Sequence, residues 1–350
     1  MGRREDFYRT VGKQRPNQIP FHFRLCDSLV QTFRRRTGKE DYYEYFDIPF
    51  REVSIKPSLH VPDYSKYHQA KKIDFIDEWG VGYIKGALAH FTSMVPPMEG
   101  FTDPQQVLEF PLPDVLAEYR WEGMEEKIKA LKEQDYVVIS GRYAIDIFEP
   151  AWYLRGMENL LIDFVLNPDM AEACLDRIYE VKCKMAARWA EVGVDVIIYG
   201  DDVGTERSMM MGLGTWRQWL KPRLHGAIAA AKEVNPNVLC YYHSDGNIED
   251  IIPDLIEIGV DILNPVQPEC MDPVAVKEKY GDSLCLWGAI GTQTTMPFDT
   301  PEGVRRTVRE MIDKLGYNGG FVVAPTHILE PDVPWENIIA FVEAVRGGIG

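Results

Sequence analysis

Short runs of β-branched and other apolar residues alternate with longer amphipathic stretches from about residue 136 to the end of the chain. This alternation is typical of βα units, in which each helix returns the chain so that successive strands lie parallel. Pro168 and Pro301 mark two helix starts, and Gly316 directly follows the second helix. The predicted strands are Tyr136–Ser140, Val194–Tyr199, Val238–Tyr242, Val260–Asn264, Leu284–Gly288 and Phe321–Ala324.

Two further short strands are predicted earlier in the chain, at Ile19–Phe23 and Glu52–Ile55. Eight parallel strands with intervening helices close naturally into a (β/α)₈ TIM barrel, which is the α/β fold that we expect. An open doubly wound sheet is the alternative, but the sequence lacks the GxGxxG segment typical of that fold. We expect residues 1–350 to form a single barrel domain with an N-terminal helical extension, and residues 57–112 to form a long insertion or lid over the barrel mouth.

The charge balance argues against two classes of partner. The chain carries 38 Lys and Arg against 54 Asp and Glu, which gives a formal net charge of −16. Nucleic acids and anionic membrane surfaces bind to basic faces, so we expect neither as a partner. No apolar run approaches the ~20 residues of a membrane span. The 6 cysteines are scattered without a CxxC pair, which is typical of reduced thiols, so we expect a cytoplasmic protein.

Polar residues follow most of the predicted strands. Barrel enzymes place their active sites at these carboxyl ends, where the side chains of different strands converge on one mouth. The third predicted strand, for example, is followed by Asp146 and Glu149. From this placement we predict five substrate-binding residues, which are Arg24, Arg142, Tyr143, Asn264 and Gln293.

A candidate metal site is formed by His243, Asp245 and His327, with Asp202 close by in the strand order. Imidazole and carboxylate ligands together suit Zn²⁺ or another divalent cation. His243 and Asp245 both follow the same predicted strand. His327 follows another strand and would complete the site from a different part of the barrel rim. The alternative is that the two histidines are hydrogen-bonded rim residues and that Asp245 caps the next helix.

Asp201 and Asp202 form a pair of adjacent carboxylates directly after a predicted strand. Two close carboxylates separate their pKa values, which suits general acid or base catalysis. Hydrogen bonding within the loop is the structural alternative for either residue. We predict catalytic roles in proton transfer for Asp202 and Asp245.

The loop after the predicted strand Val194–Tyr199 also carries three consecutive methionines, Met209–Met211. Methionine side chains are flexible and polarisable, so three of them on a rim loop would form an adaptable apolar surface for a partner protein. Packing of the same side chains into the core is the alternative.

The C-terminal half resembles the uroporphyrinogen decarboxylase superfamily, whose members are (β/α)₈ barrels. The resemblance covers about residues 190–345 and becomes weak before residue 136. Five segments carry it, in this order: Tyr241-Tyr242-His243-Ser244-Asp245-Gly246, Ile258-Gly259-Val260-Asp261-Ile262-Leu263-Asn264, Trp287-Gly288-Ala289-Ile290, Gly319-Gly320-Phe321 and Val333-Pro334-Trp335-Glu336-Asn337.

The resemblance implies one of two activities. Decarboxylases of this superfamily act on uroporphyrinogen without a cofactor and carry an Arg-Gln-Ala-Gly-Arg segment after the first strand. Here Phe21–Asp27 takes that place and offers only Arg24. The many carboxylates of such a substrate need several guanidinium partners when they are buried. The chain is therefore a poor candidate for a true uroporphyrinogen decarboxylase.

The second activity is zinc-dependent methyl transfer to or from corrinoid proteins or coenzyme M. Those methyltransferases carry His-x-Cys and a later Cys, where this sequence has His243, Asp245 and His327. The resemblance therefore implies a metal site without thiolates, which leaves the cation a stronger Lewis acid. We predict O-demethylation of a small methylated, preferably methoxylated, compound with a corrinoid carrier protein as methyl acceptor. The alternatives are a decarboxylase of a porphyrinogen or smaller acid, and a barrel that binds ligands without catalysis.

Overall fold

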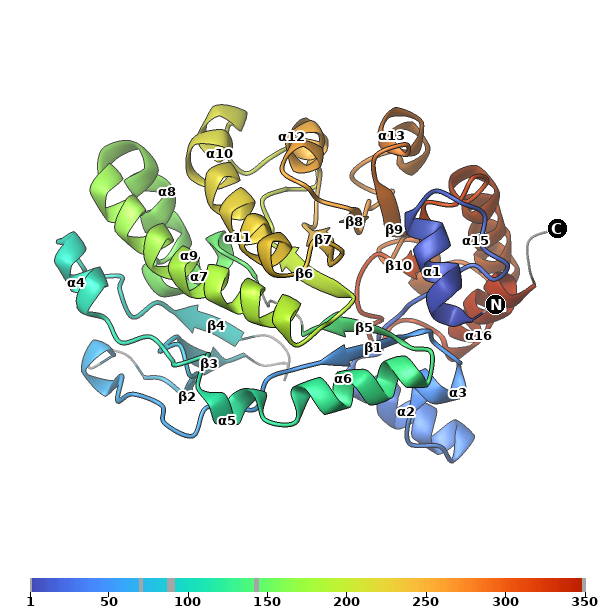
Figure 1. Ribbon diagram of the computed structural model, residues 1–350, viewed down its shortest axis with the longest axis horizontal. Coiled ribbons are helices and arrows are strands. Elements are labelled where there is room, and N and C mark those ends of the chain that lie inside the picture. The colour runs from blue at the N-terminus through green and yellow to red at the C-terminus, as the bar shows by residue number, and fades with distance from the viewer. Residues whose placement is uncertain (1, 69–71, 87–91, 142–144, 348–350) are drawn as a thin grey trace.

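Seven parallel strands form one curved sheet in the order β1-β5-β6-β7-β8-β9-β10 (Figure 1). The computed structural model describes residues 2–68, 72–86, 92–141 and 145–347. With helices on its outer side, this sheet confirms the predicted α/β barrel architecture. The strands are β1 Phe50–Val53, β5 Val137–Ser140, β6 Val196–Gly200, β7 Leu239–His243, β8 Ile262–Asn264, β9 Cys285–Ile290 and β10 Phe321–Pro325.

The prediction of a regular strand at Ile19–Phe23 is wrong. The segment is extended beside β10, but the described contact is an isolated parallel bridge between Phe21 and Val323. The N–H of His22 donates to the Val323 carbonyl at 3.0 Å, and the Val323 N–H donates to the Pro20 carbonyl at 3.0 Å. Pro20 has no N–H of its own, so it cannot extend a ladder of hydrogen bonds. The segment therefore occupies the eighth position of the barrel without forming a full strand.

Helices surround the sheet and bury apolar stripes against it. Helix α15 illustrates the pattern, because Val304, Val308, Ile312 and Leu315 are buried at helical spacing and Thr300 caps its first turn. The helices are α2 Asp27–Thr37, α3 Tyr42–Tyr45, α5 Glu118–Trp121, α6 Met124–Glu133, α7 Phe148–Arg155, α8 Met157–Leu166, α9 Pro168–Glu191, α10 Leu213–Trp219, α11 Lys221–Val234, α12 Ile252–Glu257, α13 Pro273–Tyr280, α14 Thr295–Phe298, α15 Pro301–Leu315 and α16 Trp335–Arg346, with 3₁₀ turns at Ser65–Tyr67 and Glu249–Ile251. Within the described ranges, no helix has the length and apolar character that a membrane span requires.

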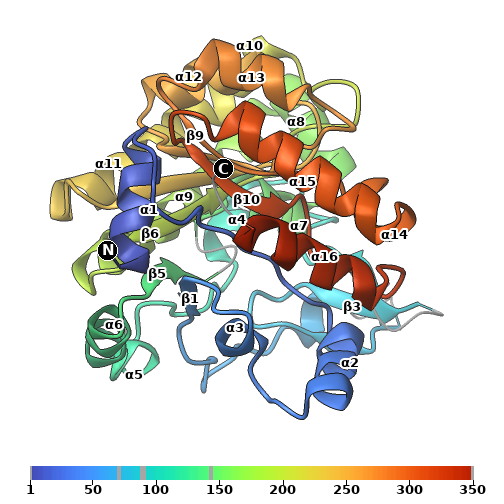
Figure 2. The same ribbon diagram turned by 90° about the vertical axis from the view of Figure 1, so that its right-hand side faces the viewer.

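Helix α1, Arg3–Val11, confirms the predicted N-terminal helical extension and lies across the amino-terminal end of the barrel (Figure 2). It is held there by Asp195, which directly precedes β6. The Asp195 carboxylate is paired with Arg4, accepts a hydrogen bond from the Tyr8 hydroxyl at 2.8 Å and lies 2.9 Å from Lys132 Nζ. Helix α1 therefore packs against the starts of β5 and β6 at this end of the barrel.

Replacing Asp195 by alanine is expected to lower the free energy of unfolding by about 3 kcal/mol, because it leaves two cations facing a buried gap. Burial opposes ionisation, but hydrogen bonds from Arg4 and the Val138 N–H hold the pKa of Asp195 below its usual value. The stabilisation is therefore present above pH ~4 and lost as the pH falls through the lowered pKa. Urea unfolding at several pH values measures it. Asp176→Ala, which removes a half-exposed partner of Arg223, is the control and should cost under about 1 kcal/mol.

The described residues between 57 and 112 form a small layer on the left of Figure 1, away from α1. Their strands β2 Phe75–Ile76, β3 Gly82–Lys85 and β4 Thr92–Val95 pair antiparallel, and helix α4 spans Pro104–Glu109. The layer is attached to the barrel through the buried Arg155 of α7, whose Nη1 donates to the carbonyls of Met98 at 2.8 Å and Phe101 at 2.9 Å. That this insertion acts as a lid over the mouth stays a prediction.

Candidate active site

A cavity opens at the carboxyl ends of the barrel strands. It has a volume of about 830 Å³ including its open mouth. Apolar side chains from the strands form part of its wall, and polar side chains, many of them titratable, form much of the rest. The titratable residues among its described lining are His22, Arg24, Glu52, Asp146, Glu149, Tyr241, His243 and His327.

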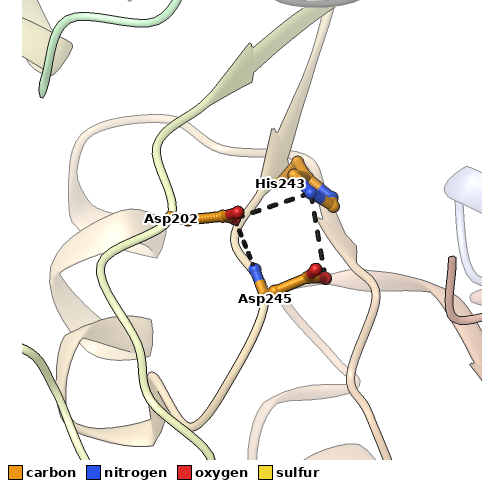
Figure 3. Close-up of side chains that lie close together, drawn as sticks. All are labelled: Asp202, His243 and Asp245. Carbon is orange, nitrogen blue, oxygen red and sulfur yellow. Dashed lines mark hydrogen bonds and ion pairs between the residues drawn. The ribbon is translucent and has the colours of Figure 1, made fainter. Parts of the chain in front are cut away.

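Three titratable side chains meet at the ends of two neighbouring strands (Figure 3). Because β6 and β7 pair with Gly200 opposite His243, the residues that follow β6 lie beside the end of β7. His243 Nε2 lies 3.6 Å from Asp202 Oδ1 and 3.9 Å from Asp245 Oδ1. The Asp245 N–H donates to Asp202 Oδ1 at 2.8 Å, which fixes the two aspartates relative to each other. The structure therefore brings together three of the residues that the sequence analysis groups.

The donor set of these three residues fits a divalent metal ion. One ligand atom from each of Asp202, His243 and Asp245 lies within 4.8 Å of the other two. Two carboxylate oxygens and one imidazole nitrogen suit Zn²⁺ and other borderline or hard divalent cations. All three side chains are partly exposed, so a cation can reach them from the mouth. Asp202, His243 and Asp245, together the metal group, form a possible metal-binding arrangement. It contains two of the three predicted ligands, His243 and Asp245, and metal binding itself stays a prediction.

His327 lies at the same end of the barrel as His243. Both side chains line the central cavity, as their positions directly after strands predict. His327 also lines a shallower neighbouring pocket together with Asp245 and Gln293. It does not belong to the group of ligand atoms within 4.8 Å, so its role as a ligand stays a prediction.

The predicted substrate-binding residues take different places. Arg24 lines the cavity, and its Nη1 lies 4.0 Å from Glu52 Oε2. Asn264 also lines the cavity, where its Oδ1 is 2.6 Å from His243 Nδ1. Gln293 belongs to the neighbouring pocket rather than to the described lining of the central one. Arg142 and Tyr143 lie outside the described residues.

The two adjacent aspartates after β6 have separate roles. The Oδ1 atom of Asp201 accepts hydrogen bonds from the N–H groups of Ile147 at 3.1 Å and Glu149 at 2.8 Å, so Asp201 secures the start of helix α7. Burial, followed by the charge of Glu149, raises the pKa of Asp201 to about 8. The loop-bonding alternative therefore describes Asp201, whereas Asp202 is one of the three residues of the metal group.

A cluster of buried titratable side chains, two of which line the cavity, has no role predicted from the sequence. Burial raises the pKa values of Asp146 and Glu149 and lowers the pKa of Lys182, which comes from helix α9. One sequence feature could have revealed this cluster, because Lys182 interrupts an apolar helical stripe. Leu175, Ile178 and Met185 on the same helix are buried. A lysine at such a position needs a charged partner inside the protein.

The three methionines do not all follow the same alternative: two pack against the core, and one is exposed on the surface. Met209 and Met211 are partly buried and pack against the core, as the core-packing alternative predicts. Met210 is 37% exposed and therefore available to a partner on the rim.

A family model described as Uroporphyrinogen decarboxylase (URO-D) matches residues 101–348. The chain belongs to the uroporphyrinogen decarboxylase family. A curated member, the uroporphyrinogen decarboxylase of Hydrogenobaculum sp. (strain Y04AAS1), is 24% identical over 227 residues, which are 63% of this chain and 62% of that protein. The match thus spans less than two thirds of the relative's length.

Among solved structures, a methyltransferase from Methanosarcina mazei superposes with a TM-score of 0.69 and 17% sequence identity, covering 99% of each chain. At this low identity the superposition shows a shared fold. Together with the family match, it confirms the resemblance seen in the sequence and the barrel architecture of this family member.

Proposed function

We propose that the chain is a metal-dependent methyltransferase that demethylates a small methylated compound and passes the methyl group to a corrinoid carrier protein. A methoxylated compound is the leading substrate class. The observation that carries the proposal is the convergence of Asp202, His243 and Asp245 at the ends of β6 and β7, where His243 lines the central cavity. Cofactor-free decarboxylation needs no such group. The methyltransferase with the same fold over the whole chain is consistent with the proposal.

The proposed reaction breaks the bond between the methyl carbon and the substrate oxygen. The substrate oxygen would keep the electron pair of the broken bond and take one proton. The corrinoid carrier, as co-substrate, would accept the methyl group with the electron pair of its reduced cobalt. Asp202, His243 and Asp245 would hold the divalent cation, which supplies Lewis-acid chemistry at the substrate oxygen when bound. The apolar part of the cavity wall, including Ile139 and Val196, would seat the body of the substrate.

The proton in this scheme would come from a carboxyl group of the site. Asp202 and Asp245 are the predicted proton-transfer residues. Glu149 is a further candidate, because it lines the cavity without belonging to the metal group, and its Oε1 accepts a hydrogen bond from the Tyr153 hydroxyl at 2.5 Å. Burial, followed by the charge of Asp202, raises the pKa of Glu149, which favours the protonated form.

Glu149→Gln is expected to lower the demethylation rate by about 10²–10⁴-fold, the usual contribution of a general acid, with metal content unchanged. Activity of the metal-loaded enzyme should fall as the pH rises through the pKa that Glu149 has beside the bound cation, and the variant should lack this alkaline limb. A pH–rate profile and elemental analysis measure both. A variant with full activity and the same alkaline limb removes Glu149 from the proton step.

Decarboxylation remains the rival function, because the curated relative is a uroporphyrinogen decarboxylase. Of the described residues that line the cavity, one is an arginine, Arg24, and Glu52 lies beside it. A substrate with many carboxylates would find little compensation for its charge in this cavity. The charges of the lining therefore favour a neutral or weakly charged substrate.

A further inference from the structure

Asn264 links the candidate metal site to the neighbouring strand. It ends β8, directly opposite His243 at the end of β7, and is 7% exposed. Its Oδ1 lies 2.6 Å from His243 Nδ1, and its Nδ2 donates to the Trp287 carbonyl at 2.8 Å. The side-chain amide therefore bridges the imidazole ring and the backbone of β9.

The chemistry of these contacts fixes the direction of each hydrogen bond. A backbone carbonyl can only accept, so the amide nitrogen of Asn264 must face Trp287 and the amide oxygen must face His243. Because that oxygen also only accepts, His243 Nδ1 carries the hydrogen. In the neutral ring this leaves a lone pair on Nε2, the atom that lies 3.6 Å and 3.9 Å from the Asp202 and Asp245 carboxylates. A lone pair facing two carboxylates is unfavourable without a cation between them.

The backbone around Asn264 is held in an unusually constrained arrangement. Val266 and Ala289 have φ angles of 50° and 71°, in a region that costs free energy for residues with a side chain and most for a β-branched one. Gly288 has a φ of 144°, and a Cβ there would lie 2.0 Å from the Pro265 carbonyl oxygen. The Ala289 N–H donates to that same oxygen at 3.1 Å. This close contact fixes Asn264 and the Trp287 carbonyl relative to each other.

We propose that Asn264 is a positioning residue that holds His243 as the Nδ1–H tautomer and directs its Nε2 atom at a divalent cation shared with Asp202 and Asp245. The inference rests on the metal site of the proposed function and is independent of the methyl-transfer step. It gives Asn264 a different role from the substrate binding that its place after a strand predicts. Such outer contacts to a ligating histidine typically contribute 10–100-fold to metal affinity.

The test compares Asn264→Ala and Asn264→Asp with the unmodified protein. Zn²⁺ and Co²⁺ affinities are measured by competition with a chromophoric chelator, and the ligand field is followed in the Co²⁺ absorption spectrum. We expect the alanine variant to bind 10–100-fold more weakly. The aspartate variant keeps an acceptor oxygen and should recover most of the affinity with a wild-type Co²⁺ spectrum.

Asn337→Ala is the matched control for the loss of a buried asparagine. Asn337 is 1% exposed and donates to the carbonyls of Met296 and Asp299 at 2.9 Å, but it lies outside the cavity lining. Its removal should lower the melting temperature without changing metal affinity. Equal affinity losses in the Asn264→Ala and Asn337→Ala variants would make the effect structural and overturn the proposal.

A direct measurement of the His243 tautomer tests the inference even if the Asn264 variants fold poorly. Long-range ¹H–¹⁵N spectra of the unmodified, metal-loaded protein distinguish the two imidazole nitrogens, and His243→Ala identifies the signals. We expect a hydrogen on Nδ1 and a metal-bound Nε2. A hydrogen on Nε2 overturns the inference. Failure of the unmodified protein to bind Zn²⁺ or Co²⁺ removes the metal site itself, and with it the proposed function, whereas wild-type affinity in Asn264→Ala removes only the positioning role.

Discussion

His243→Ala is expected to lower the affinity of the protein for a divalent cation by at least about 100-fold, which corresponds to about 2.7 kcal/mol. The variant loses the one imidazole of the group formed with Asp202 and Asp245. The two remaining carboxylates would bind the cation weakly, because metal affinity depends on the number and type of the ligands. Elemental analysis after dialysis should find about one metal ion per unmodified chain and almost none in the variant.

His22→Ala is the matched control for this measurement. His22 lines the same cavity but lies outside the metal group, and its Nε2 is 3.1 Å from the Tyr43 hydroxyl. This variant should keep its metal content. His327→Ala tests the remaining predicted ligand, since a loss of affinity there would add His327 to the site in the metal-bound protein. Equal metal content in the His243→Ala and unmodified proteins would contradict the assigned site.

Methyl transfer should be undetectable until a reduced corrinoid is supplied, either on its carrier protein or as free Co(I) cobalamin, because no other component of the reaction accepts the methyl group. Met210 is exposed on the loop after β6, so it is a candidate contact for the carrier. An aspartate there would place a charge in an apolar contact. We therefore expect Met210→Asp to raise the carrier concentration needed for half-maximal rate by about 10-fold, the effect of about 1.4 kcal/mol.

Two controls separate this expectation from its rivals. Metal affinity should be unchanged in Met210→Asp, because the loop residue lies outside the metal group. Uroporphyrinogen should not be decarboxylated, and turnover at about 1 s⁻¹ or above would reverse the functional assignment. Full demethylation of a small substrate without any corrinoid would exclude the proposed methyl acceptor and show that the rim serves as a simple cover for the cavity.

The sequence predicts the strands best where local pattern and tertiary environment agree. Strands β9 and β10 are buried along their whole length, so their continuous apolar runs mark them clearly. At Ile19–Phe23 the same kind of pattern fails, because Pro20 limits the hydrogen bonds that the segment can form. The small sheet of β2, β3 and β4 escapes prediction because its short strands lie near the surface and lack a continuous apolar pattern.

The candidate site is predictable only in part. Asp202, His243 and Asp245 can be grouped from the sequence because they directly follow strands that are consecutive and therefore adjacent in a barrel. The contact of Asn264 with His243 depends on the register of β7 against β8, which the sequence pattern does not fix. The cluster of Lys182 with Asp146 depends on the packing of helix α9 against the barrel. Neither relation has a local sequence signature.

The most direct test is an anaerobic single-turnover experiment with trideuteromethyl ethers, beginning with CD₃-labelled methoxyphenol, and free Co(I) cobalamin as methyl acceptor. Mass spectrometry follows the label and the demethylated alcohol. The account predicts one CD₃–cobalamin for each alcohol released by the metal-loaded protein, and almost none from metal-free protein or His243→Ala. Alcohol release without CD₃–cobalamin, or equal transfer by the His243→Ala variant, would contradict metal-dependent methyl transfer at this site.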